Sequence, residues 1–386
     1  MTEKLYYNDS HMFEFTATVL LCQHTDEYYK VVLNRTAFFP EGGGQYADTG
    51  YIDGVEVIDV QEDDGIIYHY MKCAVEEGKN VACKLNKHLR FMKMQQHSGE
   101  HIVSGLINRR FGYDNVGFHL GTTDCTMDFN GDITKKELRE IETEANKAVV
   151  RNLPIEVIYP TEEKLESIDY RSKKEIDGQV RIVTVPGYDI CACCAPHVSR
   201  TGEIGIIRLT NVQRYKGGVR VTMLCGFRAL EDYRVKEDNN RSISEMLCAK
   251  EYETKEAVEK LKEDNASLKI KLVKAKEDVL KSYAKELSES EEDNIWVFTG
   301  DLEADEPRIL MNSVLSYKKQ VCGVFLHTKD NNFRYVIGSR EKDVRGLAKE
   351  LNIKFNGRGG GKPEMVQGQV TGEKEVIMDF LKEKEV

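Results

Sequence analysis

The chain has 386 residues, of which 40% are hydrophobic and 31% charged, and a formal net charge of −10. This length exceeds one typical hydrophobic core, so we expect two to four domains, and the composition excludes a disordered chain. The negative charge excludes a surface that is basic all over, as in a protein coated with nucleic acid, but it leaves room for a local basic patch.

The first residues, MTEKLYYNDSHMFEF, do not form a basic segment followed by an apolar one, and no run of about 18 apolar residues occurs. We therefore expect a cytoplasmic protein that does not associate with membranes. Ten cysteines in a reducing compartment indicate free thiols or metal ligands before they indicate disulfides.

Residues 1–85 are predicted to form a β-rich, barrel-like module. Short β-branched or aromatic runs bounded by turn residues account for most of it: FEFTATVLLC, YYKVVLN, YIDGVEVIDVQ, IIYHYMK and KNVACKL. The segment RTAFFPEGGGQYADTG separates the second run from the third. Its proline and three glycines predict a loop whose backbone amides can approach a ligand closely: Pro40, Gly42, Gly43 and Gly44.

Residues 86–230 are predicted to form an α+β domain. Its first helix is expected to begin after Asn86, a suitable N-cap, and to stop at Gly112. Spacings of three and four residues place one mostly polar stripe on this helix: Met94, His97, His101, Ser104 and Asn108. Both imidazoles can therefore face one target. A strand pair at GFHLGTTDCTMDF, a helix near 134–151 and strands at IEVIYP, QVRIVTV, IGIIRLT and VRVTMLC complete the domain.

The segment RLTNVQRYKGGVRV gathers cations around an aromatic residue and a glycine-glycine turn. Its members are Arg208, Arg214, Tyr215, Lys216 and Arg220. Such a group suits nucleic acid, whereas an ordinary hairpin with solvated charges has the same pattern. Both interpretations stay open at this point.

Residues 231–290 contain no glycine or proline and many charges of both signs, which predicts a helical linker. A heptad seam extends over about three heptads and predicts a coiled coil: Val258, Leu261, Asn265, Leu268, Leu272, Ala275 and Val279. A helical hairpin packed on its own domain is the alternative, because the seam fades upstream of Val258.

Residues 291–386 alternate strands and helices, as in a small α/β domain, and end in an amphipathic helix at about 373–384. The glycine-rich stretch NGRGGGKPEMVQGQV lies before this helix, and a simple loop without a binding role is one interpretation of its three consecutive glycines. Its amides and flanking cations are suited to RNA phosphate: Arg358, Gly359, Gly360, Gly361 and Lys362.

Two pairs of metal-competent side chains lie far apart in the sequence, one in HSGEH and one in CACCAPH. The first pair lies on the predicted helix and the second on a turn-rich connection. A helix and a turn together can surround a tetrahedral Zn²⁺ with nitrogen and sulfur ligands. We therefore predict one zinc ion per chain with four ligands: His97, His101, Cys193 and His197.

Three thiols compete for the single sulfur position. We prefer Cys193, because its spacing to His197 leaves a short loop, and we expect Cys191 and Cys194 to be packed thiols. A cage of four protein ligands is typical of a structural zinc. The polar neighbours of the helix pair and the glycine loop instead favour a site that hydrolyses an ester.

The motifs RTAFFPEGGGQYADTG, HSGEH, CCAPHVSRTGEIG and NGRGGGKPEMVQ occur in this order. Together they resemble the editing half of alanyl-tRNA synthetase and its free-standing relatives, the AlaX family, in its long form. The resemblance covers nearly the whole chain. It implies an N-terminal β module at 1–85, a zinc-dependent editing domain at 86–230, a helical linker at 231–290 and a tRNA-binding domain at 291–386.

The resemblance implies hydrolysis of mischarged tRNA(Ala), chiefly seryl-tRNA(Ala) and also glycyl-tRNA(Ala), without ATP. A pocket for a small side chain rejects near-isosteres weakly, so a second hydrolytic site supplies the missing discrimination. The expected catalytic side chains are Gln45 and Glu100. Expected substrate contacts come from the glycine loop and two arginines: Arg35, Gly42, Gly43, Gly44 and Arg220. A homodimer through the linker and the C-terminal domain is a further expectation.

The sequence departs from the family pattern at two places. Glu100 stands where relatives usually carry threonine, and CCAPH replaces their C-G-G-T-H. We expect Glu100 to be a general base or an orienting group, with a solvated helix carboxylate as the alternative. A tRNA-binding protein with a structural zinc is the second hypothesis for the whole chain. A phosphoesterase is disfavoured, because the sequence contains no Asp-His-His motif.

Overall fold

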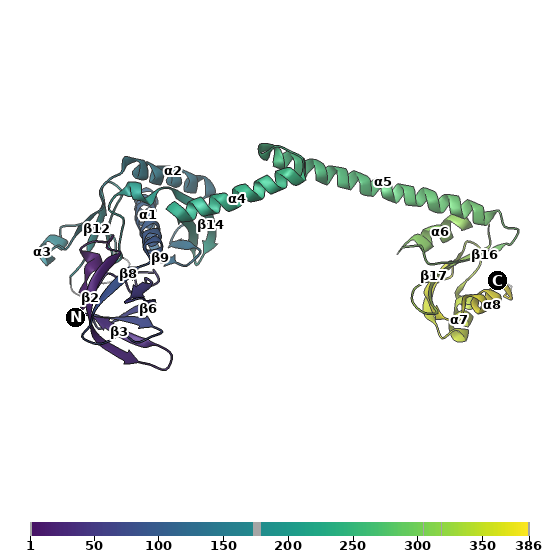
Figure 1. The fold of residues 1–386 in the computed structure, drawn as a ribbon. Helices are drawn as coiled ribbons and strands as arrows, with labels where there is room; N and C mark the ends of the chain where they lie inside the picture. The colour runs from purple at the N-terminus through teal and green to yellow at the C-terminus, as the bar shows by residue number, and fades with distance from the viewer. Residues whose placement is uncertain (1, 173–178, 304, 318, 385–386) are drawn as a thin grey trace. The chain divides into compact units, whose positions relative to one another are not determined.

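The computed structural model describes residues 2–172, 179–303, 305–317 and 319–384 (Figure 1). Helices and strands alternate with loops throughout, so the expected mixed α+β class is confirmed. The chain divides into two compact units, Met1–Ser242 and Ile243–Val386. Within the described ranges, no helix combines the length and apolar character needed to cross a bilayer.

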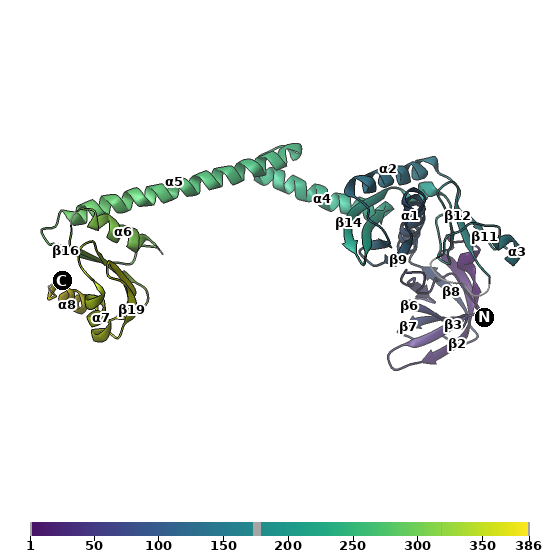
Figure 2. The same cartoon turned by 180° about the vertical axis from the view of Figure 1, so that it is seen from behind.

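The amino-terminal part of the first unit is a sheet closed on itself, with strands in the order β2-β3-β7-β6-β5-β8 (Figures 1 and 2). These strands are β2 (Glu14–His24), β3 (Tyr29–Leu33), β5 (Gly50–Ile52), β6 (Val55–Asp63), β7 (Ile66–Met71) and β8 (Asn80–Leu85). Alternate side chains fill the interior and are fully buried: Val31, Leu33, Ile52, Val57, Ile67 and Met71. A short parallel pair, β1 (Glu3–Lys4) with β4 (Arg35–Thr36), is joined to this sheet through the turn η1 (Leu5–Tyr7).

The run YIDGVEVIDVQ, expected as one strand, is a hairpin. Asp53 and Gly54 take positive φ values of 50° and 79°, and β5 pairs with β6 across them. An Asp-Gly pair adopts these angles easily in a two-residue turn. The Asp53-Gly54 pair therefore breaks the run into two strands, although β-branched residues continue on both sides of it.

The next helix, α1 (Lys87–Phe111), begins and ends as predicted. The Asn86 side chain accepts a hydrogen bond from the Leu89 N–H, and Gly112 takes a left-handed conformation with φ 70°. The helix near 134–151 is also confirmed as α2 (Lys135–Arg151), which Thr134 and Glu137 cap reciprocally.

Helix α1 packs against two sheets. The larger has the order β14-β15-β10-β9: β9 (Asn115–Leu120), β10 (Cys125–Phe129), β14 (Ile207–Tyr215) and β15 (Gly218–Cys225). The smaller contains β11 (Glu156–Ile158), β12 (Ile182–Val185) and β13 (Asp189–Ala192), with the short helix α3 (Glu162–Leu165) after β11 and the turn η2 (Thr201–Ile204) after β13. Strand β13 was missed by the sequence analysis. It carries the chain to Ala192, directly before Cys193.

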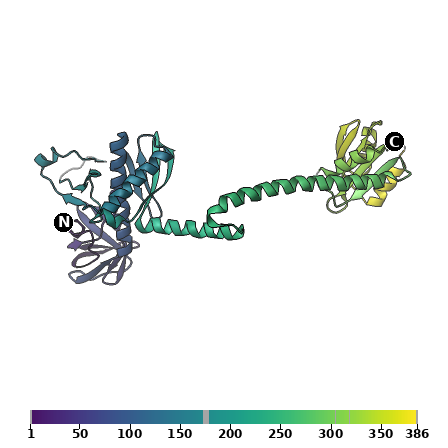
Figure 3. The same cartoon turned by 90° about the horizontal axis from the view of Figure 1, so that it is seen from above.

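Helix α4 (Gly226–Met246) crosses the boundary between the units, and the turn η3 (Glu251–Glu253) precedes the long continuous helix α5 (Thr254–Ser288) (Figure 3). The predicted seam lies on α5, and its large apolar members are 40% to 67% exposed: Val258, Leu261, Leu268, Leu272 and Val279. Only the last turns of α5 are buried in the second unit, through Leu280 and Ala284. The coiled coil therefore stays a prediction.

The second unit ends in a five-stranded sheet of order β16-β17-β18-β20-β19, with three helices. The elements are β16 (Asn294–Thr299), α6 (Glu306–Leu315), β17 (Val321–His327), β18 (Asn332–Ser339), α7 (Arg345–Lys354), β19 (Arg358–Lys362), β20 (Met365–Thr371) and α8 (Lys374–Lys382). The three consecutive glycines thus lie in the edge strand β19, so the alternative of a simple loop is wrong. A Cβ at Gly361 would run into the Met365 backbone, so glycine permits this close pairing.

A buried histidine in the barrel generates a prediction about pH. The Nδ1 of His69 donates to the Val31 carbonyl (3.1 Å), and Nε2 accepts from the Thr36 hydroxyl (2.8 Å). Burial lowers the pKa of His69 from 6.5 to about 4. The unfolded chain therefore binds a proton near pH 6.5, whereas the folded chain does so only near pH 4. The stability that neutral His69 provides is lost as pH falls through this window, by about 3 kcal/mol.

We expect the apparent Tm of the wild type to fall more steeply between pH 6.5 and 4 than that of His69→Gln. Glutamine keeps one donor and one acceptor but does not titrate, so it is the matched comparison. Differential scanning fluorimetry across this window measures both. Parallel pH profiles for the two proteins would show that His69 is not the titrating group.

Candidate metal centre

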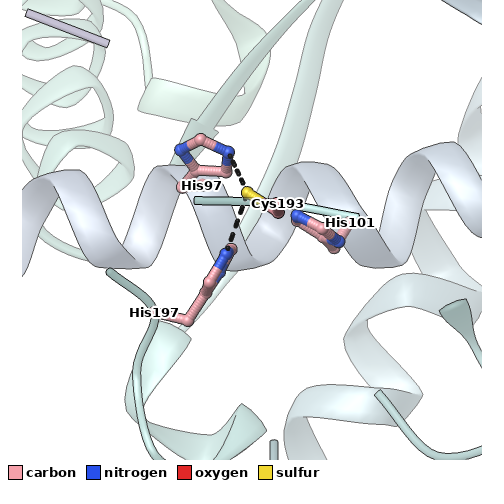
Figure 4. Close-up of side chains that lie close together, drawn as sticks. All are labelled: His97, His101, Cys193 and His197. Carbon is pink, nitrogen blue, oxygen red and sulfur yellow. Dashed lines mark hydrogen bonds between the residues drawn. The ribbon is translucent and has the colours of Figure 1, made fainter. Parts of the chain in front are cut away.

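Four side chains from two distant segments converge in the first unit, beside α1 (Figure 4). Their nitrogen and sulfur atoms all lie within 4.8 Å of one another: His97, His101, Cys193 and His197. The Cys193 Sγ lies 3.5 Å from the His97 Nε2 and 3.4 Å from the His197 Nε2. A tetrahedral zinc with typical bond lengths separates its nitrogen and sulfur ligands by about 3.6 Å. The spacing of the four atoms therefore fits one tetrahedral ion.

Each of the three imidazoles is held through its Nδ1 atom. The partners are Gln45 Oε1 for His97 (3.3 Å), Asp189 Oδ2 for His101 (2.8 Å) and Ser98 Oγ for His197 (3.2 Å). With Nδ1 engaged, Nε2 is the nitrogen that faces the cluster. Histidines that bind metals are usually oriented by such a second hydrogen bond.

The partner of His101 is itself fixed. Asp189 lies on β13, 6% exposed, and Arg171 donates to both of its carboxylate oxygens at 2.8 and 2.9 Å. Burial would raise the pKa of Asp189, but the hydrogen bonds from His101 and Arg171 outweigh burial and lower it. Asp189 therefore stays ionised and keeps the His101 proton on Nδ1.

The surroundings of Cys193 favour the thiolate form of its side chain. Burial alone would raise its pKa, but the facing imidazoles of His97 and His197 outweigh burial and hold the pKa well below its usual value. A thiolate is the form of cysteine that binds zinc. The preference for Cys193 over its two neighbours thus agrees with the geometry.

The two other thiols differ from each other. Cys191 is buried, as expected of a packed thiol, and burial raises its pKa to about 11. Cys194 is exposed, so the expectation of a second packed thiol is wrong. Past the end of β13 the chain turns, and the Cys194 sulfur lies toward Gly43 instead of entering the core.

The glycine loop forms a tight turn beside His97. Gly42 and Gln45 exchange two backbone hydrogen bonds of 3.0 and 3.1 Å, and the two central residues, Gly43 and Gly44, have φ values of 62° and 80°. The Gly44 carbonyl accepts from the Leu120 N–H at 2.7 Å, which fastens the turn to β9. Two consecutive positive φ angles explain the need for glycine.

Gln45 is 2% exposed, and its Oε1 faces His97. Its Nε2 is a buried donor without a hydrogen-bond partner among the described residues. An unpaired buried donor is costly, about 1–3 kcal/mol, and such donors concentrate at functional sites. This amide is available to a ligand at the cluster.

Glu100 is 1% exposed, so the alternative of a solvated carboxylate is wrong. Ser104 and Asn115 donate to its Oε1 at 2.7 and 2.6 Å, and its Oε2 lies 3.9 Å from the His101 Nε2. Glu100 is thereby fixed beside the nitrogen of His101 that faces the cluster. The structure thus brings Glu100, Gln45 and the glycine turn to the cluster.

The two predicted arginines do not reach the cluster. Arg35 donates to the Thr16 carbonyl at 2.8 Å and lines a groove on the barrel whose described walls contain none of the four metal-competent residues. Arg220 pairs with both oxygens of Asp128 at 2.6 and 2.7 Å. Asp128 follows Met127, which faces Ser104 on α1, so Arg220 lies on the opposite face of the sheet.

The sequence analysis also missed a buried charged group that joins the barrel to α1. Arg90 and Lys93 both bind Asp48, and all three side chains are at most 2% exposed. Lys93 also donates to the backbone carbonyls of Tyr46 (3.0 Å) and Ala47 (2.5 Å). Burial lowers the pKa of Lys93 to about 8. No local pattern could have indicated this group, because Asp48 lies 42 residues before Arg90 in the sequence.

Three family profiles match the chain in succession. They are tRNA synthetases class II (A) at residues 2–89, the Threonyl and Alanyl tRNA synthetase second additional domain at 180–222, and the DHHA1 domain at 265–385. The second match includes Cys193 and His197. The Alanyl-tRNA editing protein AlaX-L of Pyrococcus horikoshii is 28% identical, over 100% of this chain and 98% of its own length.

The chain resembles AlaX-type alanyl-tRNA editing proteins over its full length. An alanine–tRNA ligase of Halobacterium salinarum is 34% identical over 67% of this chain, and one from Pyrococcus abyssi is 29% identical over 99%. The chain covers 30% and 43% of these ligases, so it corresponds to less than half of either. The solved C-Ala domain of Aquifex aeolicus alanyl-tRNA synthetase is 22% identical over 23% of this chain and 87% of its own, at a TM-score of 0.21, which supports no argument about the fold.

The role of Asp189 can be tested at the candidate metal centre. Asp189→Asn keeps the shape of the side chain but weakens its hold on His101. We expect the affinity for Zn²⁺ to fall about 10- to 100-fold, as for other partners of metal-binding histidines. Competition with a chromophoric chelator measures the affinity, and circular dichroism checks the fold. Cys194→Ser, outside the cluster, is expected to bind Zn²⁺ like the wild type. Equal affinities for D189N and the wild type would contradict the assignment.

Proposed function

We propose that this chain is a hydrolase that deacylates mischarged tRNA(Ala), with Ser-tRNA(Ala) as its chief substrate and Gly-tRNA(Ala) as a second. The observation that carries the proposal is the convergence of three oriented imidazoles and one thiolate beside an exposed glycine turn. Similarity to an alanyl-tRNA editing protein over the full chain supports it.

The proposal assigns four parts to the chain. Residues 1–85 are the β module, 86–230 the editing domain, 231–290 the helical linker and 291–386 the tRNA-binding domain. The boundary between the compact units, at Ser242, lies inside the proposed linker. The three matched profiles follow the same order along the chain.

The metal in this proposal is Zn²⁺, one per chain. Its ligands would be the Nε2 atoms of the three imidazoles and the Cys193 sulfur. When bound there, zinc supplies Lewis-acid polarisation of an ester carbonyl and lowers the pKa of nearby water. The mixed nitrogen and sulfur donor set, with every imidazole oriented through Nδ1, suits this ion.

A second candidate is a tRNA-binding protein whose zinc is structural, as the count of four ligands suggests. The surroundings favour the enzyme. Cys193 is partly exposed, and Gly43 and Gly44 are exposed next to it. The Gln45 amide lacks a partner among the described residues. A purely structural zinc site needs neither an unpaired hydrogen-bond donor nor a solvent-exposed glycine turn beside it.

The proposed chemistry assigns one task to each group. The Gln45 amide and the N–H groups of the glycine turn donate to the carbonyl oxygen of the aminoacyl ester, where negative charge develops. Glu100 takes the proton from the attacking water as its oxygen bonds to the carbonyl carbon. It then returns that proton to the ribose oxygen as the acyl–oxygen bond breaks.

The second unit is proposed to bind tRNA through β19. Arg358 and Lys362 lie at the two ends of this edge strand, and all five of its residues are exposed. A groove of about 370 Å³ runs between the strand and α7 and is lined by Lys349 and by Arg345, whose guanidinium pairs with Asp343. Dimerisation through the exposed seam of α5 belongs to the same proposal.

Removal of a metal ligand is expected to abolish hydrolysis. His101→Ala and Cys193→Ala each take one donor from the cluster, so release of serine from Ser-tRNA(Ala) should fall to the uncatalysed rate. Binding of uncharged tRNA should stay within about twofold, since β19 belongs to the other unit. A filter assay with labelled Ser-, Gly- and Ala-tRNA(Ala) measures the rates. Undiminished deacylation by both variants would sink the catalytic assignment.

Glu100→Gln separates proton transfer from metal binding. Glutamine keeps an oxygen for Ser104 and Asn115 but accepts protons poorly. We expect kcat to fall about 10²- to 10⁴-fold while zinc content and KM change little. Ser104→Ala, which removes one anchor only, should have a smaller effect. A Glu100→Gln enzyme with wild-type kcat would exclude Glu100 as the proton acceptor.

A further inference from the structure

Five exposed cations lie at the start of α2 and at the tip of the β14–β15 hairpin, a surface that we call the α2–hairpin surface. They are Lys135, Lys136, Arg139, Arg214 and Lys216. We propose that this surface binds the backbone phosphates of the tRNA acceptor arm, separately from the second unit. The inference rests on the proposed function, because it assumes that an RNA end enters the metal centre.

The two parts of the surface are neighbours in the fold. Asp132 lines one hollow together with Arg214 and Lys216, and it precedes Lys135 by only three residues. Strand β14 is fastened along α2, where the Glu142 carboxylate accepts from the Leu209 N–H at 2.6 Å. The cations therefore share one rigid support.

These cations differ from the others in the same segment. Arg220 is paired with Asp128, and Arg208 lies 3.5 Å from Glu142. None of the five cations of the surface has an ion pair or a side-chain hydrogen bond among the described residues. Of the basic residues that the sequence places near this hairpin, Arg208 and Arg220 are thus held in ion pairs, whereas Arg214 and Lys216 are available to a ligand.

Acidic groups nearby do not cancel this charge. Glu137 accepts from Thr134 in the helix cap, and Glu140 pairs with Arg110. Asp132 is exposed and is the acidic group that lines the hollow beside the hairpin tip. Thr134 is neutral, so Glu137 keeps its negative charge. Five cations against two carboxylates without an ion pair among the described residues, Asp132 and Glu137, still leave a positive surface on a chain whose net charge is −10.

The position of two lysines on α2 is itself unfavourable for folding. Lys135 and Lys136 occupy the first turn, where the positive end of the helix dipole disfavours cations by about 0.3–1 kcal/mol each. The same location attracts phosphate, through the dipole and through the two ammonium groups together. Residues that break a local folding rule in this way are expected at functional sites.

An aromatic residue completes the hairpin tip. The Arg220 guanidinium lies 3.8 Å from the centre of the Tyr215 ring, and the Lys216 ammonium lies 5.2 Å from it. The paired arginine thus packs on the Tyr215 ring, next to the free Lys216. Aromatic rings next to cations are a common way to bind nucleic acid without reading its sequence.

The surface is connected to the metal centre through β15. This strand runs from Gly218 at the tip to Cys225, about 23 Å away at typical strand rise. The Cys225 backbone exchanges two hydrogen bonds with Gln96, of 2.7 and 2.8 Å, and Gln96 directly precedes His97. If the aminoacylated end of an acceptor arm lies at the cluster, backbone phosphates of that arm lie about 23 Å from it, which is the distance that β15 spans.

The test compares two sets of variants in the full-length chain. One set neutralises free cations on both elements, Lys135→Gln and Lys136→Gln with Arg214→Gln and Lys216→Gln. The control neutralises paired cations on the same elements, Lys147→Gln with Arg208→Gln. Fluorescence anisotropy measures binding to uncharged tRNA(Ala) and to an acceptor-stem minihelix without the elbow, at several salt concentrations.

For the first set we expect the affinity for the minihelix to fall about tenfold or more. The slope of log K against log salt should become shallower by about 0.7–0.9 for each phosphate that the variant no longer neutralises. The control should match the wild type. An unchanged minihelix affinity and slope in the first set, or an equal reduction in the control, would overturn the proposal.

Single-turnover deacylation at saturating Ser-tRNA(Ala) separates this inference from the proposed function. The first set should keep the wild-type rate constant, because its residues do not touch the metal centre. A fall in that rate constant together with unchanged RNA affinity would assign the surface a role other than phosphate binding and would overturn the proposal. If the wild type itself does not deacylate, the proposed function fails, and the anisotropy titration still decides whether the surface binds RNA.

Discussion

One buried carboxylate, Asp48, holds the barrel and helix α1 together. Arg90 donates to it through Nε at 2.7 Å, Lys93 approaches at 3.3 Å, and the Phe39 N–H donates at 2.9 Å. Burial would raise the pKa of Asp48, but the two cations outweigh burial and lower it. Loss of one member would leave an unpaired buried charge, which typically costs about 3–5 kcal/mol.

This charged group sets the position of the metal centre. Lys93 lies one helical turn before His97 and binds the carbonyls that follow Gln45 in the chain. The glycine turn, the Gln45 amide and the His97 imidazole are therefore fixed relative to one another. The other half of the centre depends on β13, whose Asp189 is bound by both His101 and Arg171. Two separate sets of buried hydrogen bonds thus fix the four metal-competent side chains and the glycine turn relative to one another.

The site combines rigid and open parts. The imidazoles are at most 4% exposed, yet the turn that faces them presents Gly43 and Gly44 to solvent. The proposed hydrolysis of an aminoacyl ester requires both properties, since the charged groups have to be preorganised while a large RNA substrate reaches them from outside. The α2–hairpin surface, in the role that we propose for it, would hold that substrate at the far end of β15.

Local patterns in the sequence determined the helix that carries His97 and His101, because Asn86 and Gly112 fix its ends through short-range capping. They also pointed to the glycine turn and to the four metal-competent side chains. Tertiary structure alone decided which polar residues serve the site. Asp189, which Arg171 holds, meets His101 only after β13 pairs with β12. Glu100 contacts Ser104 within α1, but Asn115 reaches it only when β9 packs on the helix. The same holds for Arg35 and Arg220, which bind Thr16 and Asp128 instead of facing the cluster. Spacing along the chain specifies which residues share a face of one element, whereas contacts between elements depend on how those faces pack.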